Sequence, residues 1–273
     1  MISDTQMPKA YGDIIADQVE VFGKEVSIEE CDKLPDTRDI PIEDPTAWLM
    51  IPDVICVFVD MKGSTQFSAS KQNKTTAKAY QLFTGTAVRL FDEFEAPYID
   101  VRGDGVLALF NSDQVYRSLA AAVTFRTFAC EVFESEIKKY KDPPPGAHIG
   151  IDMKTLLVRK IGLKKRNGRS DRQNEVWAGR PVNMAAKLAS RADKNELLAS
   201  DRYFAQLKSD LALKSCGCCS GKPSDDKVDL WEEIDLSEDE GVFDFAKAYR
   251  FKSIWCAVHG EEYCSQILKL DEE

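Results

Sequence analysis

The chain has 273 residues, and its 36 lysines and arginines against 46 aspartates and glutamates give a formal net charge of -10. A nucleic-acid-binding protein usually presents a basic surface, so this acidic balance argues against a nucleic-acid partner. With 44% hydrophobic and 30% charged residues, the composition is typical of a globular protein and excludes wholesale disorder and collagen-like structure.

Residues 1–45 are interpreted as an N-terminal extension. The first 13 residues lack the basic and apolar segments of a secretory signal, and no stretch approaches the roughly 18 apolar residues of a membrane span. We therefore expect a cytoplasmic protein without a membrane partner. A helix is predicted over Tyr11 to Lys24, followed by an acidic, proline-containing lead-in.

The first informative segment is the apolar run VICVFV, which extends from Val54 to Val59. A run that is apolar throughout is typical of a strand covered on both faces, and this one ends at Asp60. A turn of small residues follows. Apolar residues then recur at helical spacing between Tyr80 and Phe94, which predicts an amphipathic helix.

A hairpin is predicted over YIDVRGDGVLALF, residues 98–110, because Asp-Gly between β-forming residues is a strong turn signal. Asp104 then lies at its tip. A second long helix is predicted from about Asp113 to Tyr140, ending before the DPPPG segment. Its inward face is predicted to comprise Val115, Leu119, Ala122, Ala129, Val132 and Phe133.

The middle of the chain adds a strand, AHIGIDM, and then a basic stretch over residues 159–172 that is interpreted as a projecting hairpin or loop. Pro181 is predicted to open another helix, because proline is favoured at the first helical position. The resulting β-α-β-β-α-β order predicts an α+β fold with helices on one face of a mainly antiparallel sheet.

Residues 213–273 are interpreted as a cysteine-rich C-terminal region. Its acidic segment DLWEEIDLSEDEG is predicted to be a solvated insertion ahead of terminal strands. Cys216, Cys218 and Cys219 precede Cys256 and His259 at a spacing compatible with a tetrahedral Zn²⁺ site, and Cys216, Cys219, Cys256 and His259 are the candidate ligands. The competing interpretation is a set of reduced, unligated thiols.

Asp60 and Asp104 are the first candidates for chemistry. One ends an apolar strand and the other caps a hairpin, so both carboxylates converge on one or two hard cations if the strands are neighbours. A carboxylate at a strand end is also often structural or merely solvated. The spacing alone leaves both interpretations open.

Four motifs in one order carry a resemblance to a known family. They are VFVDMKGSTQFS, YIDVRGDGVLALF, HIGIDM and VWAGRPVNMAAKLA, and together they resemble the class III nucleotide cyclase catalytic domain over about residues 50–205. We therefore assign the cyclase core to residues 46–212. The resemblance implies a ferredoxin-like βαββαβ fold and a head-to-tail homodimer with active sites at the interface. It also implies conversion of a nucleoside triphosphate to a 3′,5′-cyclic monophosphate and pyrophosphate with two divalent cations, Mn²⁺ or Mg²⁺.

The resemblance also implies roles for individual residues. Asp60 and Asp104 match the metal-binding aspartates, and Met61 falls where a backbone carbonyl helps to hold a metal. Asn183 matches the residue that orients the ribose, and Lys187 stands where the family normally has an arginine that stabilises charge at the α-phosphate. The turn expected to approach the β- and γ-phosphates comprises Lys62, Gly63, Ser64, Thr65, Gln66 and Phe67.

The base-reading positions disfavour adenine and leave uracil, cytosine and guanine open. Adenylate cyclases carry a lysine where this chain has Asp100, and a carboxylate accepts hydrogen bonds from a base N–H rather than donating to adenine's ring nitrogen. This pattern resembles the bacterial pyrimidine cyclases of the Pycsar antiphage systems. That resemblance implies synthesis of cyclic UMP or cyclic CMP and a separate effector that responds to the product, and of the two substrates we favour UTP. Cytidylate or guanylate cyclase activity remains an alternative, as does a catalytically silent, nucleotide-binding dimer module.

Overall fold

The computed structural model describes residues 8–163, 172–218, 227–239 and 241–272. The chain divides into two compact units. One comprises residues 1–51 with 157–178, and the other comprises residues 52–156 with 179–273. Within the described ranges, none of the helices has the length and apolar character that a membrane crossing requires.

The first unit contains a helix and short strand pairs. Helix α1 (Lys9–Phe22) precedes β1 (Ser27–Glu30), which pairs in parallel with the beginning of β2 (Ala47–Lys62). The end of β5 (Gly146–Gly162) pairs antiparallel with β6 (Gln173–Ala178), as expected for a projecting hairpin in the basic stretch. The tip of that stretch, residues 164–171, lies outside the described residues.

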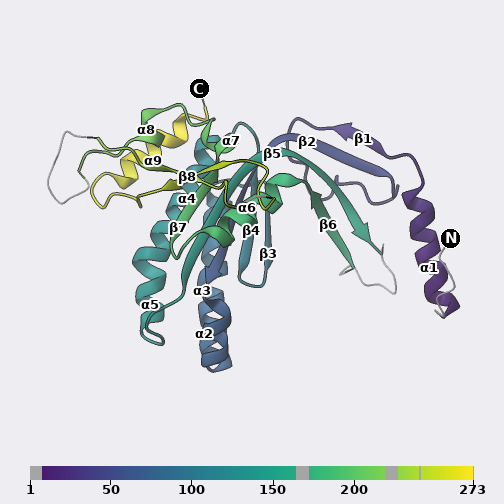
Figure 1. Cartoon of the computed structure of the whole chain (residues 1–273), viewed down its shortest axis with the longest axis horizontal. Coiled ribbons are helices and arrows are strands. Elements are labelled where there is room, and N and C mark those ends of the chain that lie inside the picture. The colour runs from purple at the N-terminus through teal and green to yellow at the C-terminus, as the bar shows by residue number, and fades with distance from the viewer. Residues whose placement is uncertain (1–7, 164–171, 219–226, 240, 273) are drawn as a thin grey trace. The chain divides into compact units, whose positions relative to one another are not determined.

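The second unit confirms the predicted α+β class and the βαββαβ order (Figure 1). Its strands lie in the order β3-β4-β2-β5, which is the ferredoxin-like arrangement. The pairs β2 with β4 and β3 with β4 are antiparallel. The elements between β2 and β5 are α2 (Ser64–Ser70), α3 (Asn73–Glu93), β3 (Tyr98–Arg102), β4 (Gly105–Phe110) and α4 (Val115–Phe128).

Three further strands extend this sheet beyond β5 in the order β7-β9-β8. The pair β5 with β7 is parallel, and the other two pairs are antiparallel. The elements are α6 (Arg180–Arg191), β7 (Glu196–Ser200), α7 (Asp201–Phe204), α8 (Asp210–Leu213), β8 (Trp231–Asp235), β9 (Lys247–Phe251) and α9 (Gly260–Lys269). The closing helix α9 was not expected from the sequence, which predicted strands at this end.

The second long helix is interrupted by a π turn, and this changes one predicted core residue. Helix α4 continues into the π-helical segment η1 (Ala129–Phe133) and then α5 (Glu134–Lys138). A π turn holds one more residue than an α turn, so it shifts the phase of the inward face. Val132 is accordingly 47% exposed, and its assignment to the core was wrong, whereas Ala129 and Phe133 are buried.

The acidic segment is not a solvated insertion throughout, as the sequence suggested. Trp231 begins β8 and is buried, and Leu236 just beyond the strand is buried as well. The acidic side chains between them point outward and pair with basic residues of the neighbouring strand. Glu233 lies 2.6 Å from the Lys247 ammonium, and Glu232 lies 3.2 Å from the Arg250 guanidinium. The high acid content therefore concealed a half-buried strand.

Gly150 is required where α6 crosses β5. A Cβ added there would lie 1.9 Å from the carbonyl oxygen of Ala185 and 2.6 Å from the backbone nitrogen of Ala189. We expect Gly150→Ala to lower the free energy of unfolding by about 2–4 kcal/mol, because helix backbone must move to admit one methyl group. Chemical denaturation followed by circular dichroism measures this change.

The matched control is Gly85→Ala on α3, where the added Cβ meets only the Gln81 side-chain nitrogen at 3.9 Å. Alanine has the higher helix propensity, so this variant should be neutral or more stable by up to about 1 kcal/mol. Equal stability of the two variants would show that β5 and α6 do not pack as closely as described.

Candidate active site

Asp60 and Asp104 lie close together, as the sequence predicted for neighbouring strands. Asp60 is near the end of β2, and Asp104 is in the turn between β3 and β4. Because β2 pairs with β4 through Val59 and Val106, the strand end and the hairpin tip meet. Each of the two carboxyl groups influences the pKa of the other.

The surroundings of Asp60 favour its ionised form. Burial alone would raise the pKa of this carboxyl, but hydrogen bonds from His148 and from the Met61 backbone N–H outweigh it, and the pKa is lowered. The His148 Nε2 atom lies 3.1 Å from Asp60 Oδ2. Asp60 is therefore the anion of the pair.

Asp104 behaves in the opposite way. Burial raises the pKa of its carboxyl, and the negative charge of Asp60 adds to the rise, although the Ser64 hydroxyl lowers the pKa by donating a hydrogen bond. A divalent cation held by both carboxyl groups would stabilise the ionised form of each. Paired, partly exposed carboxylates are the oxygen ligands that Mg²⁺ and Mn²⁺ prefer, so these residues fit a divalent cation.

His148 was interpreted from the sequence as a structural histidine without a role in the chemistry, but the structure places it beside Asp60. It lies on β5, and its side chain is only 10% exposed. Its Nδ1 atom is buried and makes no hydrogen bond within the described part of the chain. The hydrogen bond between Nε2 and Asp60 is therefore the contact through which His148 orients that carboxylate. Only the alignment of β2 beside β5 brings the two residues together, and no local sequence signal shows this alignment.

The predicted phosphate turn is a left-handed glycine followed by a short helix. Gly63 has φ 88° and precedes α2. Ser64 is brought to Asp104, while Thr65 and Gln66 are exposed. Phe67 is fully buried, and its backbone N–H donates to the Gly63 carbonyl at 3.0 Å, so both its side chain and its N–H are committed within the protein.

Lys62 is also engaged by the protein. Its ammonium group donates to the Ala192 carbonyl at 2.9 Å, just beyond the end of α6. This contact joins the phosphate turn to the helix that carries Asn183 and Lys187. Lys62 must exchange this carbonyl for a phosphate oxygen if it is to bind nucleotide.

Helix α6 begins with proline at its first turn, as predicted, and presents Asn183 on its exposed side. Lys187 lies one turn further, and its ammonium group donates to the Val242 carbonyl at 2.6 Å, in the loop between β8 and β9. Within one chain, therefore, Lys187 contacts this loop, and Asn183 faces solvent.

Asp100 lies on β3, at the end of the strand order. Its carboxylate accepts a hydrogen bond from Arg102 Nε at 2.8 Å, because residues two apart on a strand have side chains on the same face. The pair presents an acceptor and a donor side by side. A nucleobase edge with one N–H and one carbonyl offers the complementary pattern.

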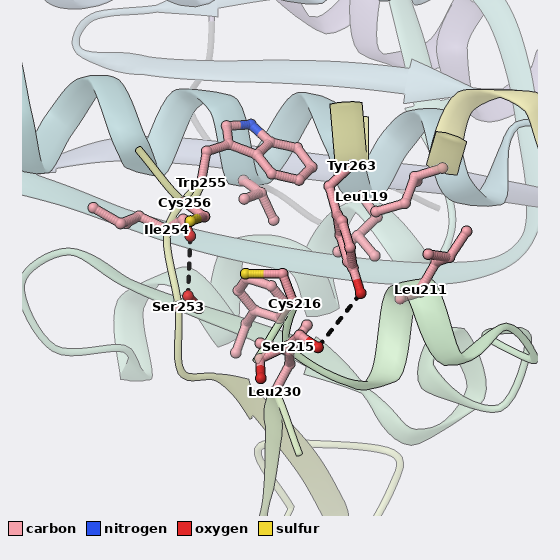
Figure 2. Close-up of a pocket in the computed structure, with 14 residues that line it drawn as sticks. Leu119, Leu211, Ser215, Cys216, Leu230, Ser253, Ile254, Trp255, Cys256 and Tyr263 are labelled. Carbon is pink, nitrogen blue, oxygen red and sulfur yellow. Dashed lines mark hydrogen bonds between the residues drawn. The ribbon is translucent and has the colours of Figure 1, made fainter. Parts of the chain in front are cut away.

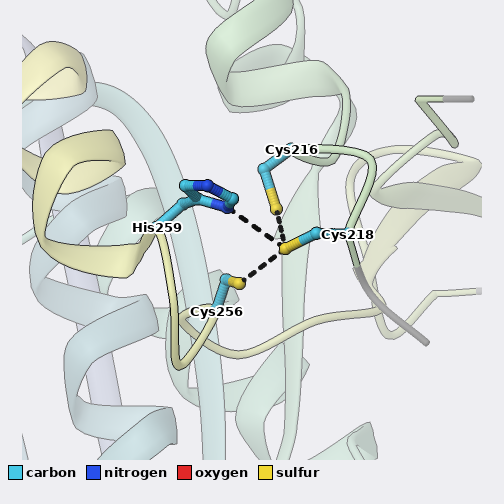
Figure 3. Close-up of side chains that lie close together, drawn as sticks. All are labelled: Cys216, Cys218, Cys256 and His259. Atoms are coloured by element: carbon cyan, nitrogen blue, oxygen red, sulfur yellow. Dashed lines mark hydrogen bonds between the residues drawn. The ribbon is translucent and has the colours of Figure 1, made fainter. Parts of the chain in front are cut away.

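The cysteine cluster differs in one member from the predicted ligand set. Cys216, Cys256 and His259 lie together, and the fourth member is Cys218. Figure 3 shows these four side chains directed toward one another. Cys219, the predicted fourth ligand, lies outside the described residues.

Comparison with known proteins places these features in context. No family model matches the chain. A uridylate cyclase of Micromonospora echinofusca is 33% identical over 238 residues, which cover 86% of this chain and 75% of the relative. A uridylate cyclase of Propioniciclava tarda is 34% identical over 247 residues, which cover 89% and 77%. The crystal structure of the adenylyl cyclase CyaB from P. aeruginosa superposes with a TM-score of 0.58 at 14% identity, covering 75% of this chain and 95% of that chain, and so shares the fold.

Proposed function

We propose that this chain, which belongs to the uridylate cyclase family within the class III nucleotide cyclases, converts UTP to 3′,5′-cyclic UMP and pyrophosphate. The observation that carries the proposal is the Asp60–Asp104 pair. Two carboxyl groups that lie close together at the end of a buried strand and the tip of the neighbouring hairpin suit divalent cations, which assist cyclisation at phosphorus.

The reaction joins the ribose 3′-oxygen to the α-phosphorus as the bond to pyrophosphate breaks. Two divalent cations, Mn²⁺ or Mg²⁺, held by Asp60, Asp104 and the Met61 carbonyl, would lower the pKa of the 3′-hydroxyl and neutralise triphosphate charge. His148 holds the Asp60 carboxylate in place at 3.1 Å, and the Ser64 hydroxyl orients Asp104. We expect the backbone N–H groups of Ser64, Thr65 and Gln66 to bind the β- and γ-phosphates.

We place the remaining catalytic groups on a second copy of the chain. In a head-to-tail homodimer, Asn183 orients the ribose and Lys187 neutralises charge at the α-phosphate of a site whose aspartates belong to the other protomer. The exposure of Asn183 supports this arrangement. To do so, the Lys187 ammonium group must leave the Val242 carbonyl and contact a phosphate oxygen instead.

Asp100 and Arg102 support uracil as the base. The carboxylate accepts a hydrogen bond from the uracil imide N–H, and the guanidinium donates to the neighbouring carbonyl. Cytosine, which offers an amino group, and guanine, which offers an N–H edge, are the alternatives. Because the chain resembles the Pycsar cyclases, we expect its product to act as a second messenger in antiphage defence and to activate a separate effector.

Product stoichiometry with UTP tests the reaction class. The purified protein, freed of divalent ions, is incubated with UTP and then with UTP plus Mn²⁺. We expect one pyrophosphate for each cyclic UMP, and only after Mn²⁺ is added. Release of orthophosphate, or of linear UMP, would identify a hydrolase instead. A folded protein that forms no product would favour the silent nucleotide-binding module that Lys187 in place of arginine suggests.

A further inference from the structure

Four soft ligand groups of the C-terminal region converge outside the proposed nucleotide site. Cys216 and Cys218 come from the segment between α8 and β8, and Cys256 and His259 come from the segment between β9 and α9. One ligand atom of each lies within 4.8 Å of all the others. The Cys218 sulfur is central, at 3.2 Å from Cys216 Sγ, 3.1 Å from Cys256 Sγ and 3.2 Å from His259 Nδ1 (Figure 3).

These distances suit a metal better than a disulfide. A disulfide needs sulfurs about 2.05 Å apart, and Cys216, Cys218 and Cys256 are all free thiols. In a tetrahedral site with Zn–S bonds of about 2.3 Å, neighbouring sulfurs lie about 3.8 Å apart. Small outward movements of these side chains therefore open a centre of the right size.

The ligand set also selects the metal. Three thiols and one imidazole are soft or borderline ligands, which favours zinc over the hard cations expected at Asp60 and Asp104. Four protein ligands close the coordination sphere, which is typical of a structural rather than a catalytic zinc site. The Val258 backbone N–H already points at Cys256 Sγ at 3.4 Å, as in sites where N–H groups support a metal-bound thiolate.

The cluster lies where it can fasten the C-terminal region to α4. Beside Cys256, the Trp255 indole N–H donates to Thr124 Oγ1 on α4 at 2.7 Å. At the other end of α9, the Asp271 carboxylate accepts hydrogen bonds from the backbone N–H groups of Tyr116 and Arg117 at 2.9 and 2.7 Å. Helix α9 is thus attached at both ends, and the cluster lies at its beginning.

A small apolar cavity adjoins the cluster. It is lined by Cys216, Cys256, Trp255 and Leu119, among others, and the Tyr263 hydroxyl donates to the Ser215 carbonyl beside it at 3.4 Å (Figure 2). Its volume of about 40 Å³ is far below that of a nucleotide pocket. The cavity is a gap in the packing between α9 and the segment that carries Cys216.

We propose that Cys216, Cys218, Cys256 and His259 bind one structural Zn²⁺ that joins the α8–β8 segment to the start of α9. The site supports the fold of the C-terminal region. It is separate from nucleotide turnover, so its test does not depend on the proposed reaction.

The test is the zinc content of the full chain, purified under reducing conditions from zinc-supplemented medium and measured by mass spectrometry of the metal. We expect about one zinc per wild-type chain and less than about 0.1 in Cys218→Ser. His259→Cys keeps four ligands and should retain the metal. Cys264→Ser, on α9 and outside the cluster, is the matched control and should also retain the metal.

Thermal unfolding gives the second readout. A chelator should lower the melting temperature of the wild type by about 5 °C or more and leave zinc-free Cys218→Ser unchanged. Wild-type protein without zinc overturns the proposal, and this result does not require any variant to fold. Zinc retained in Cys218→Ser but lost in Cys219→Ser would overturn the ligand assignment, because the structure assigns the fourth position to Cys218.

Discussion

Replacing Asp60 with asparagine is expected to lower the rate of cyclic UMP formation by at least about 1,000-fold. Asparagine keeps the shape of the side chain and its contacts with His148 and the Met61 N–H, but it removes the negative charge that binds a divalent cation. Asp104→Asn should lose a similar factor. Because the two residues act as one site, the double variant should be little worse than either single variant.

The control for this prediction lies on the same strand. Asp53 is exposed and has φ 49°, a conformation that asparagine tolerates well, so Asp53→Asn should keep its rate within about two-fold. Initial rates at saturating UTP and Mn²⁺, with circular dichroism of each variant, provide the comparison. A rate above a tenth of wild type in Asp60→Asn would remove the aspartate pair from the mechanism.

Lys187→Ala is expected to lower the rate about 100-fold, because a preorganised positive charge at the α-phosphate is lost. In the proposed dimer this loss can be complemented. Mixing Lys187→Ala with Asp60→Asn chains should restore up to about a quarter of wild-type activity, since half of the dimers are mixed and each mixed dimer has one intact site.

A matched variant separates this role from a structural one. Arg191 lies on the same helix and pairs with Asp239 of the same loop at 3.2 Å, so Arg191→Ala removes a comparable loop contact without removing a catalytic charge. Its rate should stay within about three-fold of wild type. If Arg191→Ala and Lys187→Ala were equally impaired, or if mixed chains recovered nothing while remaining dimeric, Lys187 would act only by holding the loop.

Local signals in the sequence predicted where Asp60 and Asp104 lie in the fold. The Asp-Gly turn between β-forming residues placed Asp104 at a hairpin tip, and the long apolar run placed Asp60 at a strand end. Proline in the first turn likewise predicted the helix that begins at Arg180. Each of these features depends on residues within a few positions of one another.

Features that depend on distant contacts were missed. The His148–Asp60 contact joins residues 88 positions apart, and only the alignment of two strands creates it. The π turn moved Val132 out of the core because the phase of a helix after such a turn cannot be read from a 3.6-residue period. Strand β8 was hidden because pairing with β9 neutralises its acids.

The choice of the fourth cysteine shows the same limit on a small scale. Cys218 and Cys219 are neighbours in the sequence, and their spacing to Cys256 and His259 is equally compatible with zinc. The path of the backbone after Cys216 brings Cys218 into the cluster. Sequence spacing identifies the candidate ligands, and the fold determines which of them lie close together.

The most direct test of the account is a competition in a single tube. Equal concentrations of UTP, CTP, GTP and ATP are incubated with the protein and Mn²⁺, and the products are separated by chromatography and identified by mass. We predict that cyclic UMP exceeds every other cyclic nucleotide by at least about ten-fold and is absent with Asp60→Asn. No cyclic nucleotide from a folded protein, or equal cyclic UMP from Asp60→Asn, would contradict the account.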